Sequence, residues 1–359
     1  MKKLVINKSD LIYNINKLKT TCGKTKIIAV LKGNGYGLGI TAFADILIQN
    51  GISFFAVNEL CEAVILKNAG FDSDILLMTP TNDENEARII AEHGIIATIG
   101  GIRHARLLDS VGAAVRVHVK IDTGFGRFGF DENNIEDGAG CLKSLENLHY
   151  DGVFSHFSDS FNKKSGISKK QYDLFEKCVA VLNLHGINPK MRHICNSCGV
   201  LTCEYAYLDA VRIGSAFLGR LPIKDPLGLR KIAHLHSEVV EIYTLSKGKN
   251  IGYANTYTTT KDTELAVIPA GYRDGFGVEK SKDTFRVIDV LRYTATDVLS
   301  LGKRIYVSIY GKKVPIIGRN GMCNVIADVT GLDVKVGDCV VLECNPILVD
   351  SAVEREFRI

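Results

Sequence analysis

The feature that most constrains this fold is a regular alternation of short apolar runs with helix-like stretches over the first 230 residues. Short apolar runs bounded by polar or glycine-rich segments are typical of buried parallel strands. Eight of them occur, at residues 27–31, 53–57, 75–78, 95–98, 115–120, 152–155, 191–194 and 208–212. Helix-like stretches lie between them at 40–49, 59–68, 84–92, 102–108 and 169–184. We therefore predict an α/β fold with an N-terminal (β/α)8 TIM-type barrel, and an open doubly wound sheet is the alternative.

The pattern changes near residue 230. Short strand-like runs broken by turns follow, at 238–245, 265–269, 304–309, 313–317, 324–329 and 339–343, with no long helical pattern. We expect the barrel to occupy residues 1–230 and a C-terminal all-β domain to occupy residues 231–359. A chain of 359 residues is long enough for one barrel and a smaller domain.

Composition and charge exclude several classes of protein. The 44 basic and 40 acidic residues are interspersed and give a net charge of +4, which offers no electrostatic case for nucleic-acid binding. No apolar run has the length of a membrane span, and the first ten residues lack the apolar core of a signal peptide, so we expect a cytoplasmic protein. The ten cysteines are scattered, as reduced thiols are. Cys195 and Cys198 form a lone CxxC motif, so we expect no metal site, and a redox role is the weaker option.

One lysine follows the first predicted barrel strand and begins the glycine-rich loop KGNGYGLG at residues 32–39. The glycine spacing matches a dinucleotide-binding fingerprint poorly. Lys32 would lie at the carboxyl end of a strand, which is where barrels carry their chemistry. A lysine held there beside apolar surface can lose its proton and act as an amine nucleophile. A structural lysine at the surface is the alternative.

Other strand ends also carry polar residues that packing alone does not require. They are Lys120, Asp122 and Arg127 after the fifth strand, His156 after the sixth, His193, Asn196 and Ser197 after the seventh, and Arg212, Gly214 and Ser215 after the eighth. Each has a structural explanation by itself, but a barrel would bring them to one mouth. Ser197, Gly214 and Ser215 offer hydroxyl and backbone N–H groups suited to a phosphate. A phosphate site with a reactive lysine and an arginine indicates a phosphorylated aldehyde bound as a Schiff base, namely pyridoxal 5'-phosphate.

Several motifs in order resemble those of the alanine racemase family. They are KGNGYGLG, HVKIDTGFGRFGF, FSHF, HICNS, VRIGS, GYANTY at residues 252–257, IPAGYRDGFG and GRNGM at residues 318–322. The resemblance extends over nearly the whole chain. It implies an amino-acid racemase with a pyridoxal-phosphate barrel and a β domain that contributes to the partner subunit's active site.

The resemblance implies roles for residues around the cofactor. Lys32 would bind it covalently, and Tyr36 would contact its phosphate together with Ser197, Gly214 and Ser215. Asn196 belongs to the same motif. Arg212 would face the pyridine nitrogen, and because an arginine does not give up its proton the nitrogen would stay unprotonated. His193 would support Arg212.

Racemisation removes the α-proton from one face of a planar intermediate and returns a proton to the other, so two bases are expected. The resemblance assigns Lys32 and Tyr253 to these roles, with Tyr253 supplied by the partner subunit of a homodimer. His156 is the candidate neighbour that assists the tyrosine hydroxyl. Arg127 would reach the cofactor's phenolic oxygen or the substrate carboxylate, and Lys120 matches a position that is carbamylated in many members.

Substrate choice is less constrained by the resemblance. Tyr272 and Met322 resemble residues at the substrate entrance, and Glu354 aligns with a tyrosine that narrows it. Family members usually have alanine at Gly33 and Gly35, histidine at Leu38 and aspartate at Cys323. Alanine is the leading substrate, which would imply a role in peptidoglycan precursor supply. Because of these departures, serine or a basic amino acid is the alternative substrate. A non-racemising pyridoxal-phosphate enzyme and a cofactor-binding protein are the alternative functions, although Tyr253 argues against both.

Overall fold

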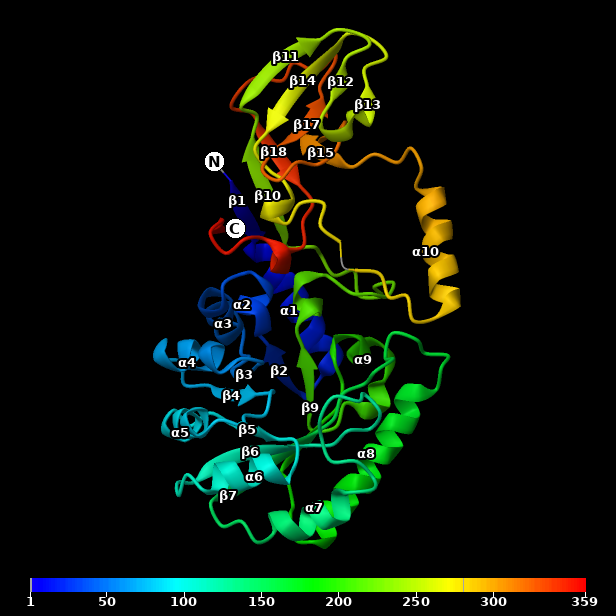
Figure 1. The fold of residues 1–359 in the computed structure, drawn as a ribbon. Coiled ribbons are helices and arrows are strands. Elements are labelled where there is room, and N and C mark those ends of the chain that lie inside the picture. Colours follow the sequence, from blue (N-terminus) through cyan, green and yellow to red (C-terminus); the bar gives the residue numbers. More distant parts are fainter. Residues whose placement is uncertain (1, 280) are drawn as a thin grey trace. The chain divides into compact units, whose positions relative to one another are not determined.

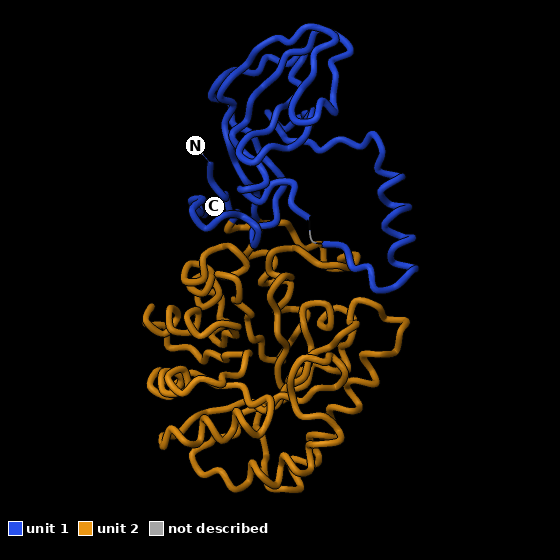
Figure 2. The backbone as a smooth tube through the Cα atoms, in the orientation of Figure 1, with its two compact units in different colours: residues 1–7, 233–359 blue, residues 8–232 orange. Residues whose placement is uncertain are grey.

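The computed structural model describes residues 2–279 and 281–359. They form two compact units, one of residues 8–232 and one of residues 2–7 together with 233–359 (Figure 2). No helix within the described residues is both long enough and apolar enough to cross a membrane.

The first unit is a parallel barrel whose strands follow the order β4-β3-β2-β9-β8-β7-β6-β5 (Figure 1). An isolated parallel bridge between Leu76 and Ile96 joins the β4 and β5 ends of this sheet, so the barrel is nearly closed. The strands are β2 (Lys26–Val30), β3 (Phe54–Val57), β4 (Asp74–Leu77), β5 (Ala97–Ile99), β6 (Val115–Lys120), β7 (Leu148–Phe154), β8 (Met191–His193) and β9 (Ala210–Ile213). The predicted barrel is therefore confirmed.

Helices alternate with the barrel strands, and the first of them precedes β2. They are α1 (Lys8–Cys22), α2 (Lys32–Tyr36), α3 (Ile40–Gln49), α4 (Leu60–Asn68), α5 (Glu84–Glu92), α6 (Ile102–Asp109), α7 (Ile135–Leu142), α8 (Ile167–Leu184) and α9 (Ser197–Thr202). Helix α5 begins where the Asp83 side chain accepts a hydrogen bond from the Glu86 N–H at 3.0 Å, an N-cap that the sequence contains. Alternate strand residues, such as Ile28 and Val30, fill the barrel interior.

The second unit is built mainly of strands. A six-stranded sheet has the order β16-β15-β18-β10-β1-β19, beside sheets β11-β14-β17 and β12-β13. The strands are β1 (Lys3–Asn7), β10 (Ala233–Glu238), β11 (Glu241–Leu245), β12 (Asn250–Ile251), β13 (Tyr257–Thr258), β14 (Thr263–Ile268), β15 (Tyr306–Ile309), β16 (Lys312–Pro315), β17 (Val325–Asp328), β18 (Cys339–Leu342) and β19 (Glu354–Arg358).

Two features of this unit differ from the sequence-based expectation. The sequence analysis places residues 3–7 in the barrel domain of residues 1–230. The N-terminal strand β1 pairs with β10 and β19, so these residues belong to this unit. Backbone pairing with strands more than 200 residues away decides this, and no local pattern reveals it. The unit also contains helix α10 (Val287–Leu299), which corrects the expectation of no long helix in this part of the chain.

Candidate active site

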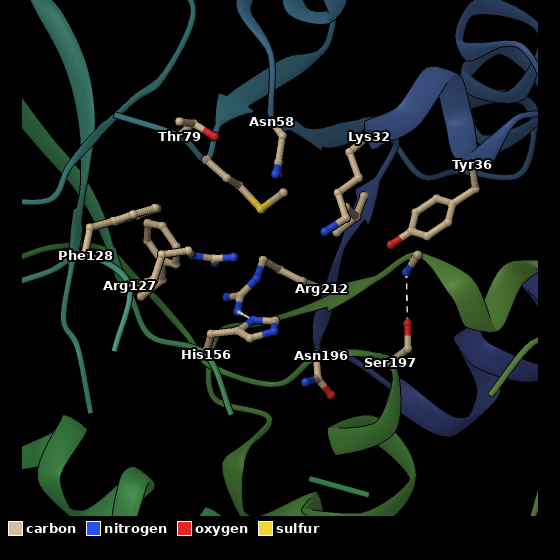
Figure 3. Close-up of a pocket in the computed structure, with 14 residues that line it drawn as sticks. Lys32, Tyr36, Asn58, Thr79, Arg127, Phe128, His156, Asn196, Ser197 and Arg212 are labelled. Carbon is tan, nitrogen blue, oxygen red and sulfur yellow. Dashed lines mark hydrogen bonds between the residues drawn. The ribbon is translucent and has the colours of Figure 1, made fainter. Parts of the chain in front are cut away.

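A cavity of about 240 Å³ lies at the carboxyl ends of the barrel strands (Figure 3). Its lining residues follow successive strands: Lys32 and Tyr36 after β2, Asn58 after β3, Thr79 after β4, Arg127 and Phe128 after β6, His156 after β7, Asn196 and Ser197 after β8, and Gly214 after β9. Val30, Met78, Phe154 and Arg212 complete the lining. Because parallel strands bring their carboxyl ends to one mouth, eight of the predicted site residues meet here.

The loop that carries Lys32 has a left-handed backbone. Residues 33–36 have φ values of 65°, 53°, 65° and 55°, a conformation that glycine adopts without strain. Asn34 fixes the turn, because its N–H donates to Glu62 Oε1 at 2.9 Å and its Oδ1 accepts from the Ile40 N–H at 2.9 Å. Gly33 and Gly35 are the two glycines that depart from the family pattern. Both have positive φ, a backbone conformation in which a side chain is strained.

Lys32 is half-buried and surrounded by positive charge. Burial lowers the pKa of its amine, and the nearby guanidinium groups of Arg127 and Arg212 lower it further, while Glu62 opposes them. Both arginines extend into the same cavity as the lysine (Figure 3). The lowered pKa shifts the lysine toward its neutral amine, which is the nucleophilic and basic form.

Arg212 lies at the centre of a buried chain of hydrogen bonds. Its Nη1 donates to His193 Nδ1 at 2.6 Å, and its Nη2 donates to His156 Nδ1 at 3.1 Å and to the Ser155 carbonyl at 2.6 Å. A guanidinium only donates, so both imidazole Nδ1 atoms accept. His193 then carries its hydrogen on Nε2 and donates to His118 Nδ1 at 2.9 Å. Sequence analysis did not single out His118.

Burial sets the charge states of the side chains in this network of hydrogen bonds. It lowers the pKa of Arg212 to about 10, so the guanidinium stays cationic at neutral pH. Burial lowers the pKa of His118 to about 3, and burial together with Arg212 holds the pKa values of His193 and His156 well below their usual range. Within this network Arg212 is therefore a fixed cation, and the three imidazoles are neutral.

A small polar cradle forms opposite Arg212. The Gly214 N–H donates to Ser197 Oγ at 3.0 Å, and the Asn196 side chain accepts from the Gly199 N–H at 2.9 Å. A Cβ atom at Gly214 would come within 2.4 Å of the Tyr36 hydroxyl, so only glycine fits there. Burial raises the pKa of Tyr36 to about 12, which keeps its hydroxyl protonated and able to donate. Ser215 begins the next turn and is not among the lining residues.

Lys120 and Asp122 lie next to the cavity and shape it. Lys120 is 2% exposed, donates to the Ile121 carbonyl at 2.6 Å, and has its pKa lowered to about 7 by burial. Asp122 accepts backbone hydrogen bonds from Gly124, Phe125 and Gly126, which form the turn before Arg127. The Arg127 guanidinium lies 4.7 Å from the centre of the Phe125 ring.

Four predicted site residues belong to the strand-rich unit. Tyr253 is 73% exposed, Tyr272 and Met322 are each 53% exposed, and the Glu354 side chain is 54% exposed. Glu354 forms an ion pair with Lys3 at 3.4 Å on the neighbouring strand β1. Their roles stay predictions.

Sequence analysis missed Asn58, Met78, Thr79 and Phe128 in the cavity lining. Asn58 and Thr79 directly follow strand-like runs, so the strand-end rule could have found them. Met78 and Phe128 carry no chemical signal, and only the tertiary structure reveals them. The ten cysteines are free thiols.

Two family models match the chain: "Alanine racemase, N-terminal domain" over residues 6–222 and "Alanine racemase, C-terminal domain" over residues 232–354. Alanine racemase 2 of Caldanaerobacter subterraneus subsp. tengcongensis is 30% identical over 356 residues, covering 95% of this chain and 84% of that protein. The alanine racemase of Bacillus anthracis, solved with bound L-Ala-P, is 25% identical with a TM-score of 0.84 over 100% of this chain and 95% of that one. That of Bartonella henselae, solved with covalently bound pyridoxal phosphate, shares the fold at 23% identity and a TM-score of 0.83, over 100% of this chain and 99% of that one.

A TIM-type barrel with a lysine at its mouth, followed by a strand-rich domain, defines a racemase-type isomerase in these comparisons. The chain belongs to the alanine racemase family. The family, the fold class and the enzyme class predicted from the sequence are confirmed.

Proposed function

We propose that this protein interconverts L- and D-alanine with pyridoxal 5'-phosphate as cofactor. The observation that carries the proposal is Lys32 in a barrel cavity, with its amine pKa lowered and two arginines beside it. The curated relative and the Bacillus anthracis structure named above, an alanine racemase with bound L-Ala-P, support alanine as the substrate.

The residues present fit the cofactor. Because Gly214 has no Cβ, the Tyr36 hydroxyl lies close against its backbone, beside the Ser197 hydroxyl that accepts from the Gly214 N–H, and these polar groups together suit a phosphate. Lys32, Tyr36, Asn196, Ser197, Gly214 and Ser215 would hold the group at its aldehyde and phosphate ends, and Arg212 would face its ring nitrogen. When bound, pyridoxal phosphate supplies a conjugated ring that makes the α-hydrogen of an attached amino acid acidic.

Arg212 would donate a hydrogen bond to the ring nitrogen without releasing a proton. Its pKa of about 10 and its bonds to His193 and His156 keep the guanidinium charged and in place. An unprotonated ring nitrogen withdraws less electron density into the ring, which disfavours side reactions such as transamination. His193 is thus a positioning residue for Arg212.

Proton transfer would use two bases. The Lys32 side chain would accept the α-proton on one face as an amine or return one as an ammonium, and the Tyr253 hydroxyl of the partner subunit would serve the other face in a homodimer. The high exposure of Tyr253 in one chain agrees with a role toward a second copy. In this proposal residues 1–230 bind the cofactor and residues 231–359 contribute to the partner's site, with His156 assisting the tyrosine.

Arg127 would bind the substrate carboxylate or the cofactor's phenolic oxygen, consistent with its place in the cavity lining. Lys120 is the proposed carbamylation site. A pKa of about 7 leaves much of its amine neutral at physiological pH. Addition of the neutral amine to carbon dioxide forms a carbamate and releases one proton, which would put an anion able to pair with Arg127 in place of the neutral amine.

The substrate entrance would include Tyr272 and Met322. The ion pair between Glu354 and Lys3 favours a solvent-facing Glu354, and with it alanine over serine or a basic amino acid. D-Alanine made in the cytoplasm would supply peptidoglycan precursors.

The test is α-hydrogen exchange in deuterium oxide, followed by NMR and chiral chromatography, with single L-amino acids and added pyridoxal phosphate. Exchange with L-alanine and appearance of D-alanine support the proposal. Exchange only with serine, or only with basic amino acids, would show that this amino acid and not alanine is the substrate. A bound cofactor with no exchange for any amino acid would overturn the racemase mechanism.

A further inference from the structure

Helix α10 presents an apolar stripe that nothing in its own unit covers. Val287, Leu291 and Val298 are 60–78% exposed, and together with Thr294 they recur at spacings of 4, 3 and 4; Leu301, 80% exposed, follows in the turn after the helix ends at Leu299. Only Asp289 is buried among the helix residues, all of which the structure describes. In Figure 1 the helix stands away from the strands of its own unit. Exposed apolar surface of this extent on one element indicates an interaction site.

The one polar residue in the stripe has its hydrogen bond within the helix. Thr294 Oγ1 donates to the Val290 carbonyl at 3.0 Å, so its hydroxyl needs no water. Ile288, 65% exposed, and the small Ala295 widen the same face. The stripe can therefore be buried over three turns without leaving a polar group unpaired.

The charges beside the stripe are neutralised within the segment. Asp289 pairs with Arg286 at 2.5 Å and with Arg292 at 2.9 Å, and Asp297 pairs with Lys282 at 2.5 Å. A surface for nucleic acid or an anionic membrane would instead present unpaired basic side chains. The partner of this face is therefore apolar and uncharged.

The 4-3 spacing favours another helix as that partner. A repeat of 3.5 residues keeps a stripe in contact with a second helix along its whole length. In an antiparallel pair of identical helices, Val287 lies opposite Val298 and Leu291 opposite the smaller Thr294, so the face complements itself. We propose that α10 pairs antiparallel with α10 of a second copy of this chain, as an isologous contact.

The size of the contact defines its role. Thirteen helical residues span about 20 Å, and a pair of such helices buries less than the roughly 1,600 Å² of a standard interface. The α10 pair therefore strengthens an association built elsewhere. In this respect the inference rests on the homodimer of the proposed function.

Sedimentation velocity on the cofactor-loaded protein tests the pairing through matched aspartate variants. Leu291→Asp and Val298→Asp add a charge to the stripe, and Thr296→Asp adds the same charge to the exposed opposite face. We expect the two stripe variants to weaken self-association by at least about ten-fold and the control to leave it unchanged. Equal association of all three variants would overturn the proposal.

Cross-linking tests the partner's identity. A mixture of Leu291→Cys chains with Thr294→Cys chains, treated with a short bismaleimide, should yield a peptide that links positions 291 and 294. These positions come from different chains, so the link reports only contact between copies. Mixing Leu291→Cys with Thr296→Cys is the control. Weakened association without this linked peptide would place another surface against α10 and overturn helix pairing.

These measurements are independent of turnover. No exchange activity in the unaltered protein, with association weakened only in the stripe variants and with the 291–294 link formed, would overturn the proposed function and leave the α10 pair standing. Full exchange activity, with equal self-association of the stripe and control variants, would support the proposed function and overturn the α10 pair.

Discussion

The barrel mouth and the strand-rich unit differ in how their functional side chains are held. In the barrel, Arg212 is 3% exposed and donates to His193, His156 and backbone carbonyls, so its position is set before any ligand binds. In the strand-rich unit, Tyr253 is 73% exposed and the stripe of α10 is open to solvent. The comparison indicates that buried hydrogen bonds hold the groups around the barrel cavity in place, whereas Tyr253 and the α10 stripe are exposed in their unit, which agrees with the proposed site shared between two chains.

Lys32→Ala should have the largest effect. Removal of this lysine from the cavity lining would eliminate both the proposed cofactor attachment and one proposed base, so exchange should fall by at least about 10³-fold. The visible absorbance of the protein-bound cofactor should disappear with it. Lys24→Ala, on the surface of the same unit, is the control and should keep both signals. Retained exchange would place the first base elsewhere.

Tyr253→Phe tests the shared half of the site. We expect exchange to fall by about 10²-fold or more with cofactor absorbance intact, and Tyr243→Phe to behave as wild type. Mixing Lys32→Ala chains with Tyr253→Phe chains should restore activity, because one site of each mixed dimer then has both bases. No recovery after mixing would contradict a site built from two chains.

His193→Ala should separate the pre-organised region from an exposed one by stability. It removes the side-chain acceptor of Arg212 Nη1, which keeps the backbone carbonyl of residue 193 at 3.2 Å, and it leaves the buried His118 Nδ1 without its donor, which should cost roughly 2–4 kcal/mol in the free energy of unfolding. His149→Ala, exposed on β7, should change it by less than about 0.5 kcal/mol. Urea unfolding measures both, and similar values would show that the buried chain of hydrogen bonds adds little.

Lys120 should make stability depend on pH. Burial lowers its pKa from 10.5 to about 7, so the unfolded chain binds more protons between these values and stability should rise with pH above about 7. Lys120→Met should reduce that rise in urea titrations of cofactor-free protein in carbonate-free buffer. An unchanged pH slope in the variant would assign the effect to another group.

Glu354→Gln should have the smallest effect. The side chain is 54% exposed and pairs with Lys3, so alanine turnover should change by no more than about three-fold and the substrate profile should stay the same. Chiral assays over alanine, serine and lysine measure this. A large loss for one of the latter two would assign Glu354 to substrate selection.

Much of the barrel was predictable because its signals are local. Helices α3 and α5 begin and end at residues 40–49 and 84–92, where the apolar pattern predicted them. The strand-end rule brought Lys32, His156 and Arg212 to one mouth, since parallel strands of a barrel share a carboxyl edge. The resemblance to a family supplied the roles of these residues, which periodicity alone does not contain.

By itself the sequence determined the order of strands and helices in the barrel, the lysine-bearing loop and the family. Only the tertiary structure decided that β1 joins the distant sheet, that His118 extends the hydrogen bonds behind Arg212, and that α10 is a helix with an exposed stripe. The physical reason is the range of the interactions. Helix caps and apolar periodicity act within a few residues, whereas strand pairing, burial and the resulting pKa shifts depend on groups brought together from far along the chain.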